Sequence, residues 1–288
     1  MKLLTYLDKR VAKIGAVVED RVIDLSGVAP DMISLIELGA EGLAQAQAAV
    51  DAATGAAPLS SVQLLAPIPD PRRNVMCLGL NYAEHIAEQT SSGEQADLPE
   101  FPIVFTKATT TANGPFDDIV LDPAVTGRLD WEVELAVVIS RAGANISREE
   151  AMAHVFGYMV LNDVSARDLQ WRHKQFFKGK SLDGACPMGP WIVTADELGD
   201  PHDLRVVCRV NGQVKQDSST TFMIFDVPAT IMHLSDGMTL LPGDIIATGT
   251  PSGVGFARTP PEFLKPGDVV ECEVERIGSI KNQIVAAR

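Results

Sequence analysis

The residues of this sequence that are best suited to chemistry begin with three acidic side chains in one short segment. Asp130, Glu132 and Glu134 alternate with the apolar residues Trp131 and Val133, so a strand here would place the acids on one face. Strands are depleted in Asp and Glu, and adjacent like charges repel unless a cation lies between them. The segment predicts either a solvated acidic face or a site for a hard divalent cation, which prefers carboxylate oxygens.

A further acid follows an apolar run at residues 155–161, which ends abruptly in the polar cluster 162–168. A turn capped by an Asx side chain would explain this cluster without any function. Alternatively, Asp163 would join Glu132 and Glu134 as a third carboxylate ligand and leave coordination positions open for a chelating substrate.

His85 and Glu88 are three residues apart in a segment that follows the apolar run 75–80. If residues 83–88 form a helical turn, the two side chains face the same side. A carboxylate beside an imidazole raises its pKa and fixes its orientation, which suits a general base that activates water. The alternative is a surface pair without function.

Two more segments contain residues that can bind anions. Lys180 lies between a glycine and a serine after two aromatic residues and could reach an anionic substrate, although most lysines are merely solvated. The Gly-, Thr- and Ser-rich loop 247–255 follows an apolar run and can point backbone N–H groups at a carboxylate. It lacks the Gly-Lys-Ser/Thr ending of a phosphate-binding loop.

The elements that must position these residues are mostly strands. Short apolar runs at 3–7, 14–18 and 22–25 precede an Ala-rich helical pattern at 31–53, and Pro67, Pro69 and Pro71 then favour an extended connector. We therefore predict a small N-terminal α+β domain over residues 1–68 and a catalytic domain over 69–288. The rest of the pattern is mainly β, interrupted by helices near Ser147 and at 225–234. The fold class is α+β, mainly β.

Composition excludes several classes of protein. The 288 residues are 46% hydrophobic and 22% charged, which is typical of globular proteins. No run approaches the roughly 20 apolar residues of a membrane span, and the N-terminus does not resemble a signal peptide, so we expect a cytoplasmic protein. Four widely spaced cysteines indicate neither a zinc ribbon nor a disulfide framework. A net charge of −14 argues against nucleic acid, and an anionic substrate would need local positive charge.

Together these motifs resemble the fumarylacetoacetate hydrolase family, over about residues 74 to 288 and in the family's order. The matching segments are 79–85 (GLNYAEH), 132–134 (EVE), 162–168 (NDVSARD), 179–181 (GKS) and 248–254 (TGTPSGV). The resemblance implies a mixed β-roll catalytic domain of the short bacterial type, usually a homodimer. Some relatives have arginine where this chain has Leu80, so one anion contact is expected to differ.

The resemblance also implies roles for individual residues. Glu132, Glu134 and Asp163 would hold Mg²⁺ or Mn²⁺. His85 and Glu88 would form the water-activating dyad, on a lid that consists of residues 85–99. Lys180 would stabilise a developing enolate. The expected substrate-binding residues are Tyr82, Lys107, Arg167, Gln170, Gly249 and Thr250.

The activity implied by this set is hydrolysis of the C–C bond of a small anionic 2,4-dioxo acid to pyruvate and a carboxylic acid. The same electron sink would serve an oxaloacetate decarboxylase or a 2-oxo-acid hydratase or isomerase, which are the alternatives within the family. A metal- or keto-acid-binding protein without catalysis is the third hypothesis. Because binding alone needs no base, the presence of both His85 and Glu88 counts against it.

Overall fold

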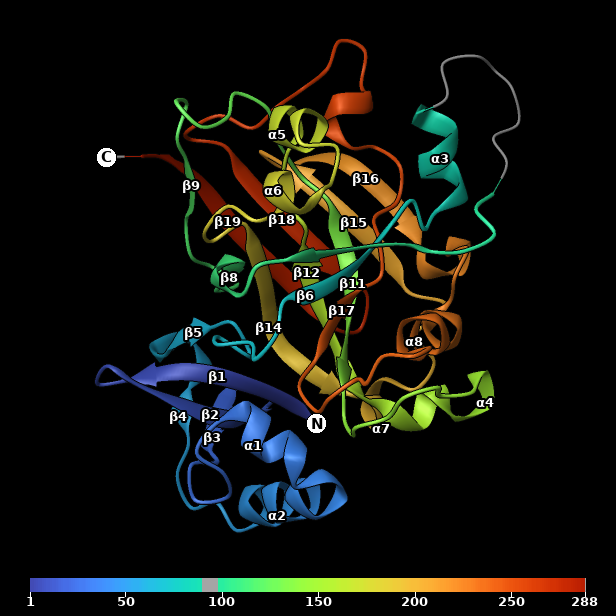
Figure 1. The fold of residues 1–288 in the computed structure, drawn as a ribbon. Coiled ribbons are helices and arrows are strands. Elements are labelled where there is room, and N and C mark those ends of the chain that lie inside the picture. Colours follow the sequence, from blue (N-terminus) through green and yellow to red (C-terminus); the bar gives the residue numbers. More distant parts are fainter. Residues whose placement is uncertain (90–97, 288) are drawn as a thin grey trace.

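The computed structural model describes residues 1–89 and 98–287 (Figure 1). Within these residues, the largest sheet has twelve strands and a second sheet has five. Strands of the second sheet pack across β11, β12 and β14. The structure confirms the prediction of a mixed, mainly β fold.

The large sheet follows the order β4 (Ala57–Pro58), β3 (Arg21–Asp24), β2 (Val11–Val18), β1 (Lys2–Asp8), β14 (Cys186–Thr194), β12 (Val155–Asn162), β11 (Val133–Ile139), β17 (Ile245–Ala247), β6 (Val75–Gly79) and β7 (Ile103–Lys107), with β5 (Gln63–Leu65) beside β1 and β8 (Ala112–Asn113) beside β14. The second sheet follows the order β16 (Gln213–Ser219), β15 (Arg205–Val210), β18 (Val269–Val274), β19 (Gly278–Ala286) and β9 (Ile119–Leu121). A short ladder joins β10 (Leu129–Asp130) to β13 (Ser165–Ala166).

The α-helices of the described residues are short and lie outside the sheets (Figure 1). They are α1 (Met32–Glu37), α2 (Gly39–Asp51), α3 (Ala83–Gln89), α4 (Arg148–Ala151), α5 (Arg167–Arg172), α6 (Phe177–Lys180), α7 (Ala195–Leu198) and α8 (Val227–Ser235). None of them is both long and apolar enough to cross a bilayer.

Strands β11 and β12 form the centre of the molecule, and every residue of both is buried. Val133, Leu135 and Val137 belong to the core between the two sheets, whereas Ala136 and Val138 pack into a second core on the opposite face. Because both faces are covered, the acidic residues at the end of these strands are held in a rigid, largely dry environment.

The N-terminal segment continues the large sheet rather than standing apart from it. Strand β1 pairs antiparallel with β14, with Lys2 opposite Val193, and Leu3 and Ile14 share a core with residues of the central strands. The segment from 66 to 74 contains no helix or strand, as its prolines predict. A domain boundary at residue 68 stays a prediction.

Two sequence predictions differ from the structure in detail. The helical pattern at 31–53 is split into α1 and α2, because Gly39, the first residue of α2, adopts a positive φ of 59°. The strand expected over 130–135 is also interrupted: β10 ends at Asp130 and β11 begins at Val133. Asn162 Oδ1 accepts the N–H of Glu132 at 3.0 Å in place of a strand contact.

Candidate active site

Three predicted metal ligands come together where β11 begins and β12 ends. Because these strands are antiparallel, with Glu134 opposite Leu161, Asp163 lies beside Glu132 and Glu134. One carboxylate oxygen from each acid lies within 4.8 Å of one from each of the others, and all three side chains are buried. The N–H of Asp163 donates to the carbonyl of Glu132 at 2.8 Å, which holds the two segments in register.

Three cations surround this carboxylate cluster. Lys107 Nζ lies 2.7 Å from Asp163, and Lys180 Nζ lies 2.6 Å from Glu132 and 2.7 Å from Asp163. Arg167 Nη2 lies 2.6 Å from Glu132 Oε1 in an ion pair that lacks the alignment of a hydrogen bond. Burial alone would raise the pKa of Glu132, but Lys180 and Arg167 lower it to about 2.

Glu134 differs from the other two acids because it forms no ion pair within the described residues. Its carboxylate accepts the backbone N–H of Gly249 at 2.7 Å. Burial, together with the negative charges of Asp163 and Glu132, raises its pKa well above the usual range. A buried carboxylate without a cation is costly, and a metal ion would remove this cost.

The residues present fit Mg²⁺ or Mn²⁺. All donors are carboxylate oxygens, which hard divalent cations prefer. Counting Asp130, four buried carboxylates face the three cations Lys107, Arg167 and Lys180, which leaves a charge of −1 when all four are ionised, as metal binding requires of the ligands. A divalent ion would convert this to +1 and so favour an anionic substrate. This is the one group of three potential ligands that the described residues form.

The predicted dyad forms on α3. His85 Nδ1 lies 2.9 Å from Glu88 Oε1, and Glu88 Oε2 accepts the N–H of Gly253 at 2.7 Å. At the start of the helix, the hydroxyl of Ser218 donates to Glu84. The lid predicted for residues 85–99 includes residues 90–97, which lie outside the described residues.

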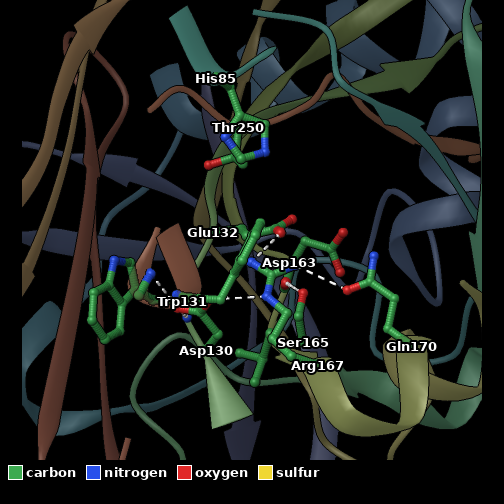
Figure 2. A network of polar contacts seen from close by, with 12 residues as sticks. His85, Asp130, Trp131, Glu132, Asp163, Ser165, Arg167, Gln170 and Thr250 are labelled. Carbon is green, nitrogen blue, oxygen red and sulfur yellow. Dashed lines mark hydrogen bonds and ion pairs between the residues drawn. The ribbon is translucent and has the colours of Figure 1, made fainter. Parts of the chain in front are cut away.

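A cavity of about 190 Å³ is lined by His85 of the dyad and by Glu132 of the carboxylate cluster. Its volume is roughly that of six water molecules in the liquid, which suits a small acid. The lining residues are Leu78, Gly79, Leu80, His85, Phe105, Glu132, Arg167, Gln170, Trp171, Phe176, Lys180, Thr250 and Phe256. In Figure 2, His85 and Thr250 lie on one side of Glu132, and Arg167 and Gln170 lie on the other. A larger cavity of about 270 Å³ near Lys13 and Arg72 contains none of the predicted site residues.

The other predicted substrate-binding residues, Tyr82, Lys107 and Gly249, are not among those that line this cavity. Tyr82 is buried with its hydroxyl unpaired within the described part of the chain, and burial raises its pKa. The ammonium group of Lys107 contacts Asp163 and the carbonyl of Val164. The N–H of Gly249 binds Glu134 rather than facing the cavity.

The loop after β17 binds the protein's own carboxylates instead of presenting an open anion site. The N–H groups of Gly249, Gly253 and Gly255 donate to Glu134, Glu88 and Asp130, each at 2.7 Å. Gly253 has a φ of +99°, and a Cβ there would lie 2.1 Å from the carbonyl oxygen of Lys215, so a side chain is not tolerated. The loop therefore connects a candidate metal ligand, the dyad and Asp130.

Sequence reasoning missed the aromatic wall of the cavity and the partner of Asp130. The Arg167 guanidinium lies 4.4 Å from the centre of the Phe256 ring, and Lys180 Nζ lies 5.0 Å from that of Phe105. Trp171 directly follows the predicted site residue Gln170 in the sequence, and this proximity could have identified it as a cavity-lining residue. Asp130 is not part of the carboxylate group formed by Glu132, Glu134 and Asp163; it pairs with Arg167, which also contacts Glu132.

Comparison with known proteins identifies the family. The family model described as "Fumarylacetoacetate (FAA) hydrolase C-terminal" matches residues 74–285. The chain belongs to this family. Two similar curated proteins are oxaloacetate tautomerases. YisK of Bacillus subtilis (strain 168) is 53% identical over 226 residues, covering 78% of this chain and 74% of the relative. The mitochondrial Fahd2a of Rattus norvegicus is 45% identical over 269 residues, covering 92% and 84%.

Solved structures of family members have the same fold. A fumarylacetoacetate hydrolase from Exiguobacterium antarcticum has a TM-score of 0.88 at 42% identity, with both chains covered completely. A maleylpyruvate hydrolase from Sphingobium sp. SYK-6, solved with manganese(II) and pyruvate, has a TM-score of 0.82 at 29% identity, again with complete coverage. The family thus includes enzymes named for tautomerisation and for hydrolysis, and it acts on small oxo acids.

Proposed function

We propose that this family member is a divalent-metal-dependent tautomerase that interconverts the keto and enol forms of oxaloacetate or a closely similar 2-oxo dicarboxylic acid. The observation that carries this proposal is that His85, a base oriented by Glu88, lines the same small cavity as Glu132 and the cations Arg167 and Lys180. The identity of 45% to 53% to oxaloacetate tautomerases supports this reaction over the expected hydrolysis.

Mg²⁺ or Mn²⁺, held by Glu132, Glu134 and Asp163, would act as a Lewis acid that stabilises negative charge on the 2-oxo group. The protein supplies the proton transfer. A carboxylate only accepts hydrogen bonds, so Glu88 holds the proton of His85 on Nδ1 and makes Nε2 the basic nitrogen. His85 removes a proton from C3 of the keto form, and the same proton is returned to the oxygen at C2 to give the enol. The C3–H bond breaks and an O–H bond forms, while the double bond moves from C2–O to C2–C3. No water is consumed and no carbon–carbon bond is cleaved.

The cavity walls assist this exchange. Lys180 and Arg167 place positive charge where the enolate develops, which lowers its energy most strongly in a dry site. The aromatic side chains of Phe105, Phe176 and Phe256 form an apolar part of the cavity wall. Exclusion of water keeps the proton on His85 for return to the substrate.

Hydrolysis of an acylpyruvate is the second candidate function. The same dyad could deprotonate a water molecule instead of a carbon acid, and the solved maleylpyruvate hydrolase has the same fold. The two functions differ in whether water takes part in the reaction.

The deciding experiment incubates the purified protein and Mg²⁺ or Mn²⁺ with the enol form of oxaloacetate. Loss of the ultraviolet absorbance of the enol should accelerate above the spontaneous rate, while proton NMR shows only the keto form as product. A parallel panel of acylpyruvates detects hydrolysis, and formation of pyruvate from oxaloacetate detects decarboxylation. Unaccelerated ketonisation with rapid acylpyruvate cleavage would reject the tautomerase in favour of the hydrolase.

We also propose that the protein is a homodimer, as the family resemblance implies. Among the described residues, β7 is an edge strand of the large sheet. Its residues Ile103 and Val104 are 38% and 47% exposed, and Phe101 just before it is 64% exposed. Exposed apolar side chains on an edge strand favour pairing with another chain. Light scattering should give a mass near twice 30.9 kDa; a mass of 30.9 kDa at micromolar concentration would reject the dimer.

A further inference from the structure

Asp130 is a buried carboxylate to which neither the proposed metal site nor the proposed proton transfer assigns a role. Its side chain accepts four contacts. Oδ1 accepts the N–H groups of Trp131 and Gly255 at 2.8 and 2.7 Å, and Oδ2 accepts the N–H of Phe256 at 3.0 Å and Nε of Arg167 at 2.9 Å. This number of donors fixes the position of both oxygens.

Arg167 connects Asp130 to the site. Its Nε binds Asp130, its Nη1 donates to Gln170 Oε1 at 3.0 Å, and its Nη2 lies 2.6 Å from Glu132 (Figure 2). The ring of Phe256 covers the guanidinium at 4.4 Å. Because a guanidinium is planar with its donors in a fixed fork, the position of Nε determines where Nη1 and Nη2 point.

We propose that Asp130 is a positioning residue that limits the contact between Arg167 and Glu132 and thereby keeps Glu132 available to a divalent ion. Without the negative charge of Asp130, the guanidinium would pair with Glu132 alone. A bidentate pair would then extend from Oε1 to Oε2 of Glu132, the oxygen that Lys180 contacts at 2.6 Å, and compete directly with the ion. The inference rests on the proposed metal centre but not on the identity of the substrate.

The structure contains a matched control in Asp244, at the opposite end of β11 and β17. Asp244 is also buried, pairs with Nε of Arg73 at 3.0 Å and accepts a backbone N–H, that of Leu241, at 2.7 Å. The residue lies opposite Ile139, five positions along β11 from Glu134, or about 17 Å at the rise of a strand. A substitution of Asp244 therefore removes the same kind of carboxylate–guanidinium contact as a substitution of Asp130, but at a distance from the candidate metal ligands.

The experiment measures Mn²⁺ affinity of the substrate-free protein by calorimetry or by electron paramagnetic resonance of free Mn²⁺. Asp130→Asn, which keeps the shape of the side chain, should weaken binding at least tenfold, whereas Asp244→Asn should change it less than twofold even if both lose thermal stability. An Asp130→Asn protein that folds and binds Mn²⁺ within twofold of the parent would overturn the proposal.

A double-mutant cycle separates positioning from long-range charge. If Asp130 acts through Arg167, adding Asp130→Asn to Arg167→Met should change Mn²⁺ affinity less than threefold, because no guanidinium remains to be positioned. If the two single effects add, Asp130 acts only by its charge and the proposal is wrong. The comparison of Arg167→Met with the double variant does not require the Asp130→Asn single variant. The test therefore remains usable if Asp130→Asn alone folds poorly.

Glu134→Gln distinguishes the possible failures. If it leaves Mn²⁺ binding unchanged, the metal centre itself is wrong, and with it the proposed function. If it weakens binding while Asp130→Asn does not, only the role of Asp130 fails.

Discussion

At the two ends of strand β11, buried carboxylates are matched by cations to different extents. At one end, Asp244 and Arg73 form a pair of one carboxylate with one guanidinium, completed by the N–H of Leu241. At the other end, where β11 begins, four carboxylates face three cations, and Glu134 has only the N–H of Gly249 among its described hydrogen bonds and ion pairs. The cavity that His85 and Glu132 line is at this second end and not at the Asp244 end.

This difference separates a structural ion pair from a candidate active site. The buried carboxylate of Asp244 has a partly exposed cation and hydrogen bonds as partners, so its charge is satisfied without a further ligand. An unmatched buried carboxylate beside a cavity is costly in the absence of a ligand, and such groups cluster where a protein binds or reacts. Charge balance therefore distinguishes the two ends, and so does burial of the cations: the Arg73 side chain is 36% exposed, whereas those of Lys107, Arg167 and Lys180 are at most 3% exposed.

The largest effect should follow from removing the unmatched charge. Glu134→Gln is expected to weaken Mn²⁺ binding at least a hundredfold and to abolish turnover, because the ion loses a buried anionic ligand. Thermal stabilisation by Mn²⁺ should disappear with it, since ligand binding stabilises only a native state that binds. Glu149→Gln, an exposed change of the same type on α4, serves as the control. Equal Mn²⁺ stabilisation of the parent and Glu134→Gln would contradict the comparison.

Loss of the base should affect turnover without affecting the metal. His85→Ala is expected to slow keto–enol exchange, and any acylpyruvate hydrolysis, on the order of 10²–10⁴-fold, the usual contribution of general acid–base catalysis. Mn²⁺ affinity should remain within twofold. Decarboxylation of oxaloacetate, which needs chiefly an electron sink, should change less. Exchange that survives within a few-fold would remove His85 from the mechanism.

The unmatched charge should also make metal-free stability depend on pH. Because the pKa of Glu134 is raised in the folded state above the usual 4.5, the native protein keeps a proton that the unfolded chain has lost. Stability should therefore fall as pH rises from about 4.5 towards the raised value, by up to about 1.4 kcal/mol per pH unit. Urea unfolding in a chelator measures this slope. Glu134→Gln should reduce it, and Asp244→Asn should not.

The smallest effect concerns substrate approach. Residues 167–180 carry five Lys and Arg against one Asp, so this segment has a charge of +4 in a chain whose remaining residues carry −18. Lys174 and Lys178 are exposed, form no ion pair within the described residues, and lie two positions from the cavity-lining Phe176. Two residues span at most about 7 Å, which is within a Debye length at physiological salt.

Reversing these two charges should lower kcat/KM for a dianionic acid a few-fold and leave kcat unchanged, and added salt should reduce the difference. The variant Lys174→Glu/Lys178→Glu is compared with Lys9→Glu/Arg10→Glu, which changes two exposed cations in the β1–β2 turn. Steady-state kinetics at several ionic strengths measures both. Equal losses in the two variants would show that net charge, and not the position of the segment, controls approach.

Much of the local structure was predictable from the sequence because periodicity and capping report directly on it. Apolar runs predicted strands such as β1, β2 and β3. The helix expected near Ser147 is α4, and Ser147 caps it by accepting the N–H of Glu150. The acids that meet at the site were also named from residue type and spacing, because two-residue alternation and the end of an apolar run are local properties.

Which distant groups meet was decided only by the tertiary structure. Asp130 pairs with Arg167 across 37 residues, Lys107 meets Asp163 across 56, and Gly253 holds Glu88 across 165. An alternating pattern specifies the face of a strand but not its neighbour, so it placed Asp130 with Glu132 and Glu134. Strand pairing and the path of the loop after β17 instead bring donors to Asp130 and leave Glu134 without a cation within the described residues, because both depend on how the two sheets pack around one core.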